Sequence, residues 1–256
     1  MHSDAILNEF THQSNAFNVS PIMSSAQTLD SLIEILPASP EQTWLEVACG
    51  PGLISRAMAP LVRSVQGVDL TAAMIDVAAR EAAQRGISNV TFSVGDATAL
   101  PFEDSSFDGA VTRFSLHHIP LPARCVHEMA RVVKPEGWVV IGDHIATDEA
   151  EEAALHQELE RLRDPSHWAC LTAERLRQMA SAAGLQPVRE RLIPMALDYE
   201  EWLMRGSGGP TWGNLITREL EQRHAGYDTF RLAPSPDGVP TLHLRYWLSL
   251  WQKVTI

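Results

Sequence analysis

The chain has 256 residues, of which 45% are hydrophobic and 20% are charged, and its formal net charge is -12. These values suit one globular α/β domain with an appended cap, which we expect, or two small domains, and they exclude a disordered protein. The negative charge and the lack of a basic stripe argue against a nucleic-acid partner, because binding to polyphosphate requires clustered Lys and Arg.

Signals for membranes and secretion are also missing. No apolar run approaches the roughly 20 residues that cross a bilayer, and the start MHSDAILNEF lacks the layout of a signal peptide. Cys49, Cys125 and Cys170 are far apart and form no C-x-x-C motif. We therefore expect a cytoplasmic protein with reduced thiols and no membrane span. Its oligomeric state is open, with a homodimer as one option.

The first two thirds of the chain predict a parallel sheet. The segment up to residue 36 reads as one or two helices, with a break at Asn18-Val19-Ser20-Pro21. From about residue 44 to 143, short apolar runs then alternate with helical patterns, which is typical of β-α-β units. The predicted strands are Trp44–Cys49, Ser64–Asp69, Asn89–Val94, Phe107–Phe114 and Gly137–His144.

Helical spacing of Ala, Leu and Met separates these strands. The predicted helices are Gly52–Val62, Thr71–Arg85 and Leu121–Val133, the last followed by a turn at Lys134-Pro135-Glu136-Gly137.

The last third of the chain predicts two further helices and an antiparallel pair of strands. An acidic helix follows Asp148 as far as about Arg163, and a second helix spans Thr172–Ala183. The strand-like segment Leu185–Leu197 is expected to pair with the final apolar run, Leu242–Val254.

Between these two strands lies an insertion with a flexible Gly206–Gly209 stretch. An aromatic-rich insertion of this length favours a lid over a substrate pocket, and the alternative is ordinary core packing within a cap. Its aromatic residues are Tyr199, Trp202, Trp212, Tyr227 and Phe230.

Taken together, the elements predict an α/β protein with a Rossmann-like doubly wound sheet of about seven strands. The sheet is expected to be mostly parallel with an antiparallel last strand, and a helical cap is added to it. The predicted parts are an N-terminal helical lid (1–36), a Rossmann-like core (37–197), a cap insertion that lines the substrate pocket (198–240) and the final strand of the sheet (241–256).

The first candidate binding element is the turn Ala48-Cys49-Gly50-Pro51-Gly52, which joins a buried strand to a helix. Glycines let a backbone approach a ligand closely, and the amides at a helix start favour a polar or anionic group. Many strand-to-helix turns use glycine for geometry alone, so this loop needs further support.

Two acidic residues provide that support. Asp69 ends the second predicted strand, 19 residues after Gly50, a spacing at which a carboxylate accepts both hydrogen bonds of a ribose diol. Asp96, after the third strand, is placed to accept a hydrogen bond from an exocyclic amine. The alternatives are a cap for the helix near Thr71 and a simple loop aspartate, respectively.

Five motifs then occur in order: LEVACGPG, GVD, the GDA-x-x-LPF-x-D-x-SFD run, SLHHI and EMARVVKPEGWVVI. This set resembles the class I S-adenosylmethionine (SAM)-dependent methyltransferases, especially the small-molecule branch that includes the ubiquinone and menaquinone C-methyltransferases. The resemblance covers about residues 40 to 145. One departure is Ala48, where the family often has glycine.

The resemblance implies SAM as cofactor, a small-molecule acceptor and a set of site residues. Glu46 and the backbone of Ala48, Gly50 and Gly52 would face the methionine part of SAM, Asp69 and Leu70 the ribose, Asp96 and Ala97 the adenine, and Met74 the adenosine. Thr112, followed by Arg113, matches the place where the backbone meets the cofactor's amino group. Phe17 and Asn18 match the place where such enzymes close over the cofactor.

Histidines are the candidate general bases, because methyl transfer to a hydroxyl or an acidic carbon benefits from one near neutral pH. His117 and His118 follow the fourth strand, where ligands of open α/β sheets gather. A capping or packing role is the alternative, and we expect at most one of the pair to face the acceptor.

Further candidates for the substrate cleft are His144 and Trp168, together with Trp202 and Trp212 of the insertion. The spacing of Asp143, His144 and His167 matches no tight metal motif, so the sequence indicates no metal site.

Two other functions stay open at this point. A glycine loop followed by an acidic residue also fits an NAD-dependent oxidoreductase, although the third glycine of G-x-G-x-x-G is absent. The fold could also keep SAM for non-methylating chemistry such as elimination or cyclisation.

Overall fold

The computed structural model describes residues 2–19, 26–223 and 230–254. All the predicted parallel strands are present in it and pair in parallel with their neighbours. The inner strands are buried along nearly their whole length, which is why they read as continuous apolar runs. The strands are β1 (Thr43–Val47), β2 (Ser64–Asp69), β3 (Val90–Val94), β4 (Phe107–Arg113) and β5 (Val133–His144), in the spatial order β3-β2-β1-β4-β5.

One predicted turn is wrong. The segment 134–137 lies inside β5, where it forms a bulge rather than a connection. Val133 pairs with Phe107, and the next pair joins Trp138 to Gly109. The extra residues on β5 are accommodated by this shift of register, so the strand begins four residues earlier than its apolar run suggests.

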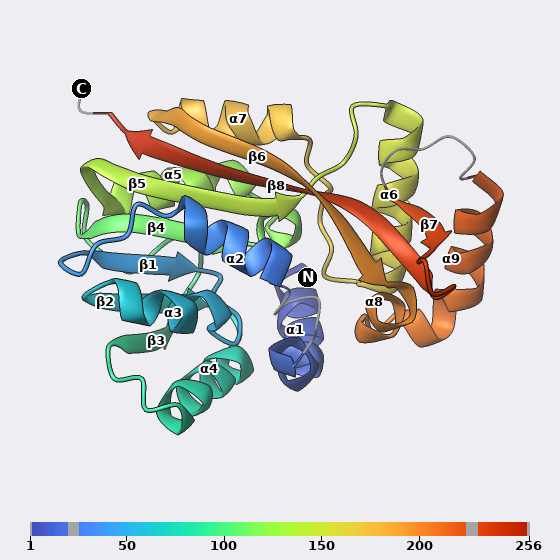
Figure 1. The fold of residues 1–256 in the computed structure, drawn as a ribbon, viewed down its shortest axis with the longest axis horizontal. Helices are drawn as coiled ribbons and strands as arrows, with labels where there is room; N and C mark the ends of the chain where they lie inside the picture. The colour runs from blue at the N-terminus through green and yellow to red at the C-terminus, as the bar shows by residue number, and fades with distance from the viewer. Residues whose placement is uncertain (1, 20–25, 224–229, 255–256) are drawn as a thin grey trace.

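Helices cover both faces of the sheet (Figure 1). Each face has its own hydrophobic core: Trp44 and Met58 belong to one, and Val126 and Met129 belong to the other. One layer comprises α2 (Ala26–Ile35), α3 (Leu53–Met58, continued by a 3-10 turn at Ala59–Leu61) and α4 (Ala72–Gln84), and the other comprises α5 (Pro122–Val132) and α7 (Ala173–Ala182).

The predicted antiparallel pairing near the C-terminus is confirmed. β8 (Pro240–Lys253) lies between β5 and β6 (Leu185–Asp198) and runs antiparallel to both. β8 pairs with β6 along nearly its whole length. Its second half also pairs with β5, whereas its first half continues past β5 and also pairs with the short β7 (Arg231–Pro234). With β7 included, the described residues form one sheet of eight strands.

A helical region surrounds the extended end of β6 and β8 (Figure 1). Trp202 and Phe230 are buried there with their rings in edge contact, 5.9 Å between centroids, and Tyr199 stacks on Trp202. These aromatic residues therefore pack as core, whereas Tyr227 lies outside the described residues. The helices of this region are α6 (Ala150–Arg163), α8 (Tyr199–Arg205) and α9 (Gly209–Arg223).

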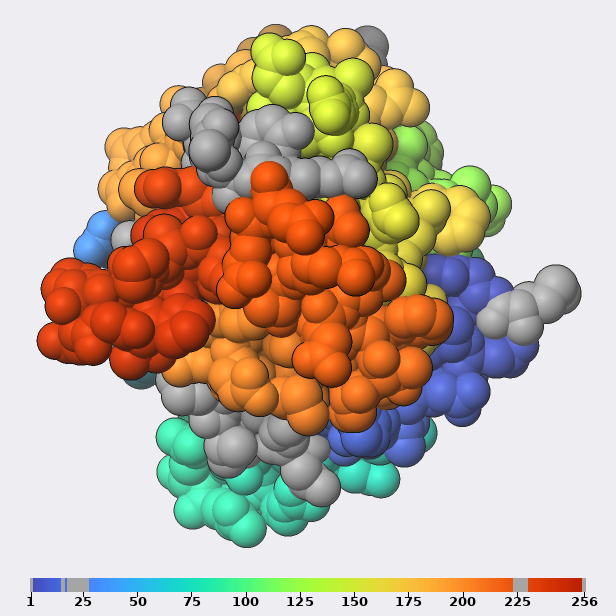
Figure 2. All heavy atoms as spheres, turned by 90° about the vertical axis from the view of Figure 1, so that its right-hand side faces the viewer, coloured from blue at the N-terminus to red at the C-terminus, as the bar shows by residue number. Residues whose placement is uncertain are grey.

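The N-terminal helix α1 (His2–Val19) lies beside this region. Figure 2, which faces it, shows the blue surface of α1 next to the orange surface of α9. The predicted break between the N-terminal helices falls partly on residues 20–25, outside the described residues. None of the described helices is long and apolar enough to cross a membrane.

The glycines of 206–209, expected to be flexible, are instead tightly packed at a junction of α1, α6 and α8. A Cβ on Gly208 would lie 1.9 Å from the Leu162 carbonyl oxygen. The Gly208 amide donates to the Arg163 carbonyl oxygen at 2.9 Å, and the Ser207 amide donates to Glu9 Oε1 at 2.8 Å. Glycine is needed here because backbone approaches backbone.

We expect Gly208→Ala to destabilise the fold by about 1–3 kcal/mol, since the new methyl group must displace backbone atoms. Gly213→Ala is a matched control, because its Cβ would meet a movable side-chain atom of Leu203 at 3.1 Å. Urea unfolding of both variants measures the difference. Equal stability of the two variants would contradict the packing role of Gly208.

Candidate functional site

A cavity of about 350 Å³ lies at the carboxyl ends of the parallel strands. Its walls come from the loops after β1, β2, β3 and β4 and from one face of α1. This is the edge at which open α/β sheets bind their ligands. Ten of the residues predicted for the cofactor line this cavity: Phe17, Glu46, Ala48, Gly50, Asp69, Leu70, Met74, Asp96, Ala97 and Arg113.

The loop after β1 turns through left-handed backbone at Ala48, Gly50 and Gly52, with φ of 53°, 51° and 73°. Gly50 lines the cavity, and a Cβ built on it meets no atom within 4 Å. Gly52 does not line the cavity; its Cβ would lie 2.7 Å from the Phe92 ring. The two glycines therefore differ: Gly50 borders the cavity, whereas Gly52 lets α3 start close to β3.

Asp69 holds two backbone segments together. Its Oδ2 accepts from the Gly50 amide at 2.8 Å, and its Oδ1 accepts from the Thr71 amide at 2.9 Å at the start of α4. Burial raises the pKa of Asp69, against the effect of these two hydrogen bonds. Asp69 therefore fixes the turn that leads into α4 but does not cap the helix, whose N-cap residue is Thr71. A carboxylate with these two partners still has lone pairs for a ligand in the cavity.

Glu46 is held in the cavity wall by the first turn of α3. Its Oε2 accepts from the Ser55 amide at 2.7 Å and from the Ser55 hydroxyl. Burial raises the pKa of Glu46 to about 7, against the Ser55 hydrogen bonds and the attraction of Arg113 and Arg56. Sequence reasoning missed Ser55, although a helix start always offers free amides to a nearby carboxylate.

The raised pKa of Glu46 makes stability depend on pH. The folded chain keeps this carboxyl protonated where the unfolded chain, near its ordinary 4.5, has released the proton. The stability this contributes is complete below about pH 4.5 and is lost as pH rises through about 7. Between pH 5 and 8 we expect the unfolding free energy of the cofactor-free wild type to fall by at most about 3 kcal/mol more than that of the Glu46→Gln variant. Urea unfolding of both proteins across this pH range tests the prediction. Parallel curves of unfolding free energy against pH for the wild type and the variant would contradict it.

Two further residues predicted for the cofactor are Thr112 and Asn18. Thr112 is fully buried, and its Oγ1 donates to the Val47 carbonyl oxygen at 2.8 Å, outside the cavity lining. Asn18 belongs to α1, but its side chain is outside the described residues. Sequence reasoning missed an apolar face of α1, whose Ser3, Ile6 and Phe10 line the cavity together with Phe17. Their spacing of three, four and seven residues is the helical signal that was available.

A second cavity of about 40 Å³ adjoins the first, and Phe17, Phe114 and His118 line both. The predicted residues His117, His144 and Trp202 also line it. Trp168 and Trp212 line neither cavity; they are 39% and 44% exposed.

His117 and His118 are both buried, and both line the second cavity. Their side chains have separate partners. His117 Nδ1 lies 2.6 Å from Asp143 Oδ1, and burial, followed by the nearby His118, keeps the pKa of His117 well below its ordinary value. His118 Nδ1 lies 3.0 Å from the hydroxyl of Ser166.

Ser166 connects His118 to a buried carboxylate. Its hydroxyl donates to Asp164 Oδ1 at 2.5 Å. Burial alone would raise the pKa of Asp164, but His118, Arg163 and the Ser166 hydrogen bonds outweigh it and hold the pKa below its ordinary value. Because the Ser166 proton is used on Asp164, His118 Nδ1 must donate to Ser166, and His118 Nε2 is the basic nitrogen.

Known methyltransferases resemble this chain along most of its length. Residues 45–141 match the family model described as a methyltransferase domain. The uncharacterized methyltransferase YcgJ of Bacillus subtilis (strain 168) is 30% identical over 235 residues, which cover 90% of this chain and 92% of YcgJ. The crystal structure of YcgJ matches with a TM-score of 0.80 and covers 90% of this chain and 99% of that one.

Two further proteins extend the likeness. The crystal structure of BH2331 from Bacillus halodurans C-125 is 25% identical, covers 89% of this chain and 99% of that one, and has a TM-score of 0.82. A demethylmenaquinone methyltransferase of Staphylococcus aureus (strain JH9) is 28% identical over 208 residues, 79% of this chain and 74% of that protein. These findings decide against the NAD-dependent alternative. The chain belongs to the class I SAM-dependent methyltransferases, and SAM is its cofactor.

Proposed function

We propose that the chain methylates a small organic molecule whose reacting group occupies the second cavity. The observation that carries this proposal is the wall shared by the two cavities, formed by Phe17, Phe114 and His118. A ligand in the large cavity and an acceptor in the small one would meet at this wall. Holding two reactants in such contact is the main contribution an enzyme makes when one of them is already activated.

The residues of the large cavity fit SAM. Its volume of about 350 Å³ is within the range of cofactor pockets. We assign Asp69 to the ribose hydroxyls, Glu46 to the cationic methionine end and Asp96 to the adenine amine, with Leu70 and Met74 against the adenosine. When bound, SAM supplies a methyl group already activated by its sulfonium.

His118 is the general base in this proposal. Its Nε2 would take a proton from an acceptor hydroxyl or acidic carbon, while Nδ1 donates to Ser166 and Ser166 donates to Asp164. The buried carboxylate then stabilises the imidazolium through this chain of hydrogen bonds. His117 contacts Asp143 instead, and of the two cavities it lines only the second.

The second cavity limits the acceptor. A volume of about 40 Å³ admits a small molecule or the reacting end of a larger one. Its walls combine apolar side chains such as Leu244 and Trp202 with a larger number of polar and charged ones, which suits the polar reacting end of an organic molecule. The polar and charged residues are Gln13, His117, His118, His144, Glu160, Arg163, Asp164 and Arg205. The similarity to a demethylmenaquinone methyltransferase supports an organic acceptor of this kind.

The lid and cap roles also remain proposals. Segment 1–36 would close over the cofactor through α1, and segment 198–240 would bound the acceptor side through Trp202. Trp168 and Trp212 line neither cavity, so they would contact the acceptor only at the entrance to the second cavity.

The test has two steps. Isothermal titration with SAM and S-adenosylhomocysteine measures cofactor binding, and incubation with a panel of phenols and hydroquinones measures formation of S-adenosylhomocysteine. Binding with turnover on at least one compound supports methyl transfer to a small molecule. Binding without turnover on any member of the panel would favour non-methylating chemistry, and no binding of either compound would overturn the assignment of the large cavity.

A further inference from the structure

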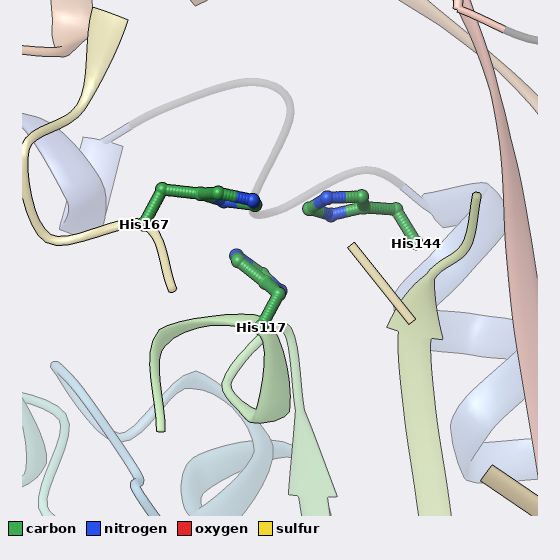
Figure 3. A group of neighbouring side chains, drawn as sticks. All are labelled: His117, His144 and His167. Atoms are coloured by element: carbon green, nitrogen blue, oxygen red, sulfur yellow. The ribbon is translucent and has the colours of Figure 1, made fainter. Parts of the chain in front are cut away.

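Three buried histidines from distant parts of the chain converge beside the second cavity. His117 lies in the 3-10 turn Leu116–His118 after β4, His144 ends β5, and His167 lies between α6 and α7. One ring nitrogen from each lies within 4.8 Å of the corresponding nitrogen of the others. Figure 3 shows the three rings directed toward a common space.

Two ring nitrogens of this cluster lack partners within the part of the chain that the structure describes. His144 Nε2 and His167 Nδ1 are buried and have no hydrogen-bond partner among the described residues. A buried polar atom without a partner destabilises the fold, so two of them in one cluster require an explanation. No side chain of the described residues satisfies them, and because they belong to imidazole rings that converge on one space, a metal ion is a ligand that all of these rings could bind together.

We propose that His117, His144 and His167 bind one divalent transition-metal ion, of which Zn²⁺ is the best match. Imidazole nitrogens are preferred ligands of Zn²⁺, at about 2.0–2.1 Å, so the three nitrogens would need to lie about 3.4 Å apart. The three nitrogens lie within 4.8 Å of one another, so binding would draw them closer together.

A carboxylate supports the site from outside. Asp143 Oδ1 lies 2.6 Å from His117 Nδ1, and the same oxygen accepts from the His144 backbone amide at 2.9 Å. Metal-binding histidines commonly place their second nitrogen against a carboxylate, which fixes the ring and directs the other nitrogen to the ion. This contact makes His117 Nε2 the nitrogen that faces the cluster.

A second set, His144, His156 and Cys170, also meets the spacing of a metal site. It shares His144 with the first set, so one ion at His144 cannot satisfy both. The first set is preferred because its His117 has the supporting carboxylate and because His117 and His144 both line the second cavity.

The position of the site indicates its role. Three protein ligands leave a fourth position open, which is the arrangement of catalytic rather than structural zinc sites. Since His117 and His144 line the second cavity, the open position would hold an oxygen of the acceptor and lower the pKa of its hydroxyl. This role rests on the proposed function, whereas metal binding itself does not.

Metal content and Co²⁺ spectroscopy test the site. The full chain, prepared without a polyhistidine tag, is stripped with a chelator and titrated with Zn²⁺ and with Co²⁺, whose visible absorption reports bound ligands. We expect one ion per chain, and about 100-fold weaker binding in His144→Gln and in His167→Gln; Asp143→Asn should weaken binding by about 10–100-fold. His127→Gln, an exposed histidine on α5, is the matched control.

Several outcomes would overturn the site. These are no bound ion in the wild-type chain, or equal affinity in the wild type, His144→Gln and His167→Gln, as expected if the space holds water or if the metal binds surface histidines. Because a variant could fail to fold, circular dichroism is measured on each, and the wild-type Tm must rise with added Zn²⁺.

The role is tested separately from the site. Azide, a small anionic ligand, should shift the Co²⁺ bands if the fourth position is open, and an unchanged spectrum would overturn the role in holding an acceptor. Titration with SAM in the stripped protein distinguishes failure of the metal site from failure of the proposed function.

Discussion

Replacing His118 with asparagine is expected to lower kcat by about 10²–10⁴-fold for an acceptor that loses a proton on methylation. The variant removes the basic Nε2, which lies in a ring that borders both cavities. Steady-state formation of S-adenosylhomocysteine with the best compound of the acceptor panel measures the effect. An unchanged kcat would contradict the role of general base.

Ser166→Ala separates positioning from chemistry in the same experiment. It keeps the imidazole but interrupts the hydrogen bonds from His118 to Asp164. Without the Ser166 hydroxyl, His118 is no longer held with Nδ1 as the donor and Nε2 as the basic nitrogen, so kcat should fall while binding of SAM is unchanged. His127→Asn, on the exposed face of α5, is the control that should leave both kcat and binding unchanged.

The second large effect concerns the cofactor. Asp69→Ala should weaken binding of SAM and of S-adenosylhomocysteine by about 1–3 kcal/mol, roughly a factor of 5 to 150. The substitution removes a charged acceptor from the cavity and also releases the amides of Gly50 and Thr71. Isothermal titration measures the affinity, and equal dissociation constants for wild type and variant would contradict the assignment.

Two further variants isolate the causes. Asp76→Ala removes an exposed acidic residue of α4 and controls for the loss of charge. Asp69→Asn keeps one carbonyl oxygen, enough for the Thr71 amide, but its amide nitrogen cannot accept from Gly50. If loop geometry alone matters, Asp69→Asn should lose nearly as much affinity as Asp69→Ala, and the unfolding free energy should fall in parallel.

Much of the fold followed from local signals in the sequence. The parallel strands are continuous apolar runs, and the helices between them have regular apolar spacing, so both were predicted to within a few residues. The errors lie where packing competes with local preference. Residues 134–137 have turn chemistry but are drawn into β5, and the glycines 206–209 are fixed by the backbone of α6.

The cofactor side of the site was also accessible from sequence. Glu46, Asp69 and Asp96 follow or end strands that are neighbours in a parallel sheet, and the carboxyl ends of such strands necessarily meet at one edge. Recognising the strands therefore brought these residues together without any knowledge of the tertiary structure.

The sequence by itself determined the parallel sheet and ten of the residues around the large cavity, because strands are short segments with their own periodicity and most of these residues lie at strand ends. Its five motifs in addition carried the resemblance to the class I methyltransferases. Only the tertiary structure decided the second cavity, the hydrogen bonds from His118 through Ser166 to Asp164, and the cluster of His117, His144 and His167. These features join segments whose proximity depends on how α1 and the loop between α6 and α7 pack against the edge of the sheet. No spacing along the chain encodes such contacts, since they arise from the packing of whole elements.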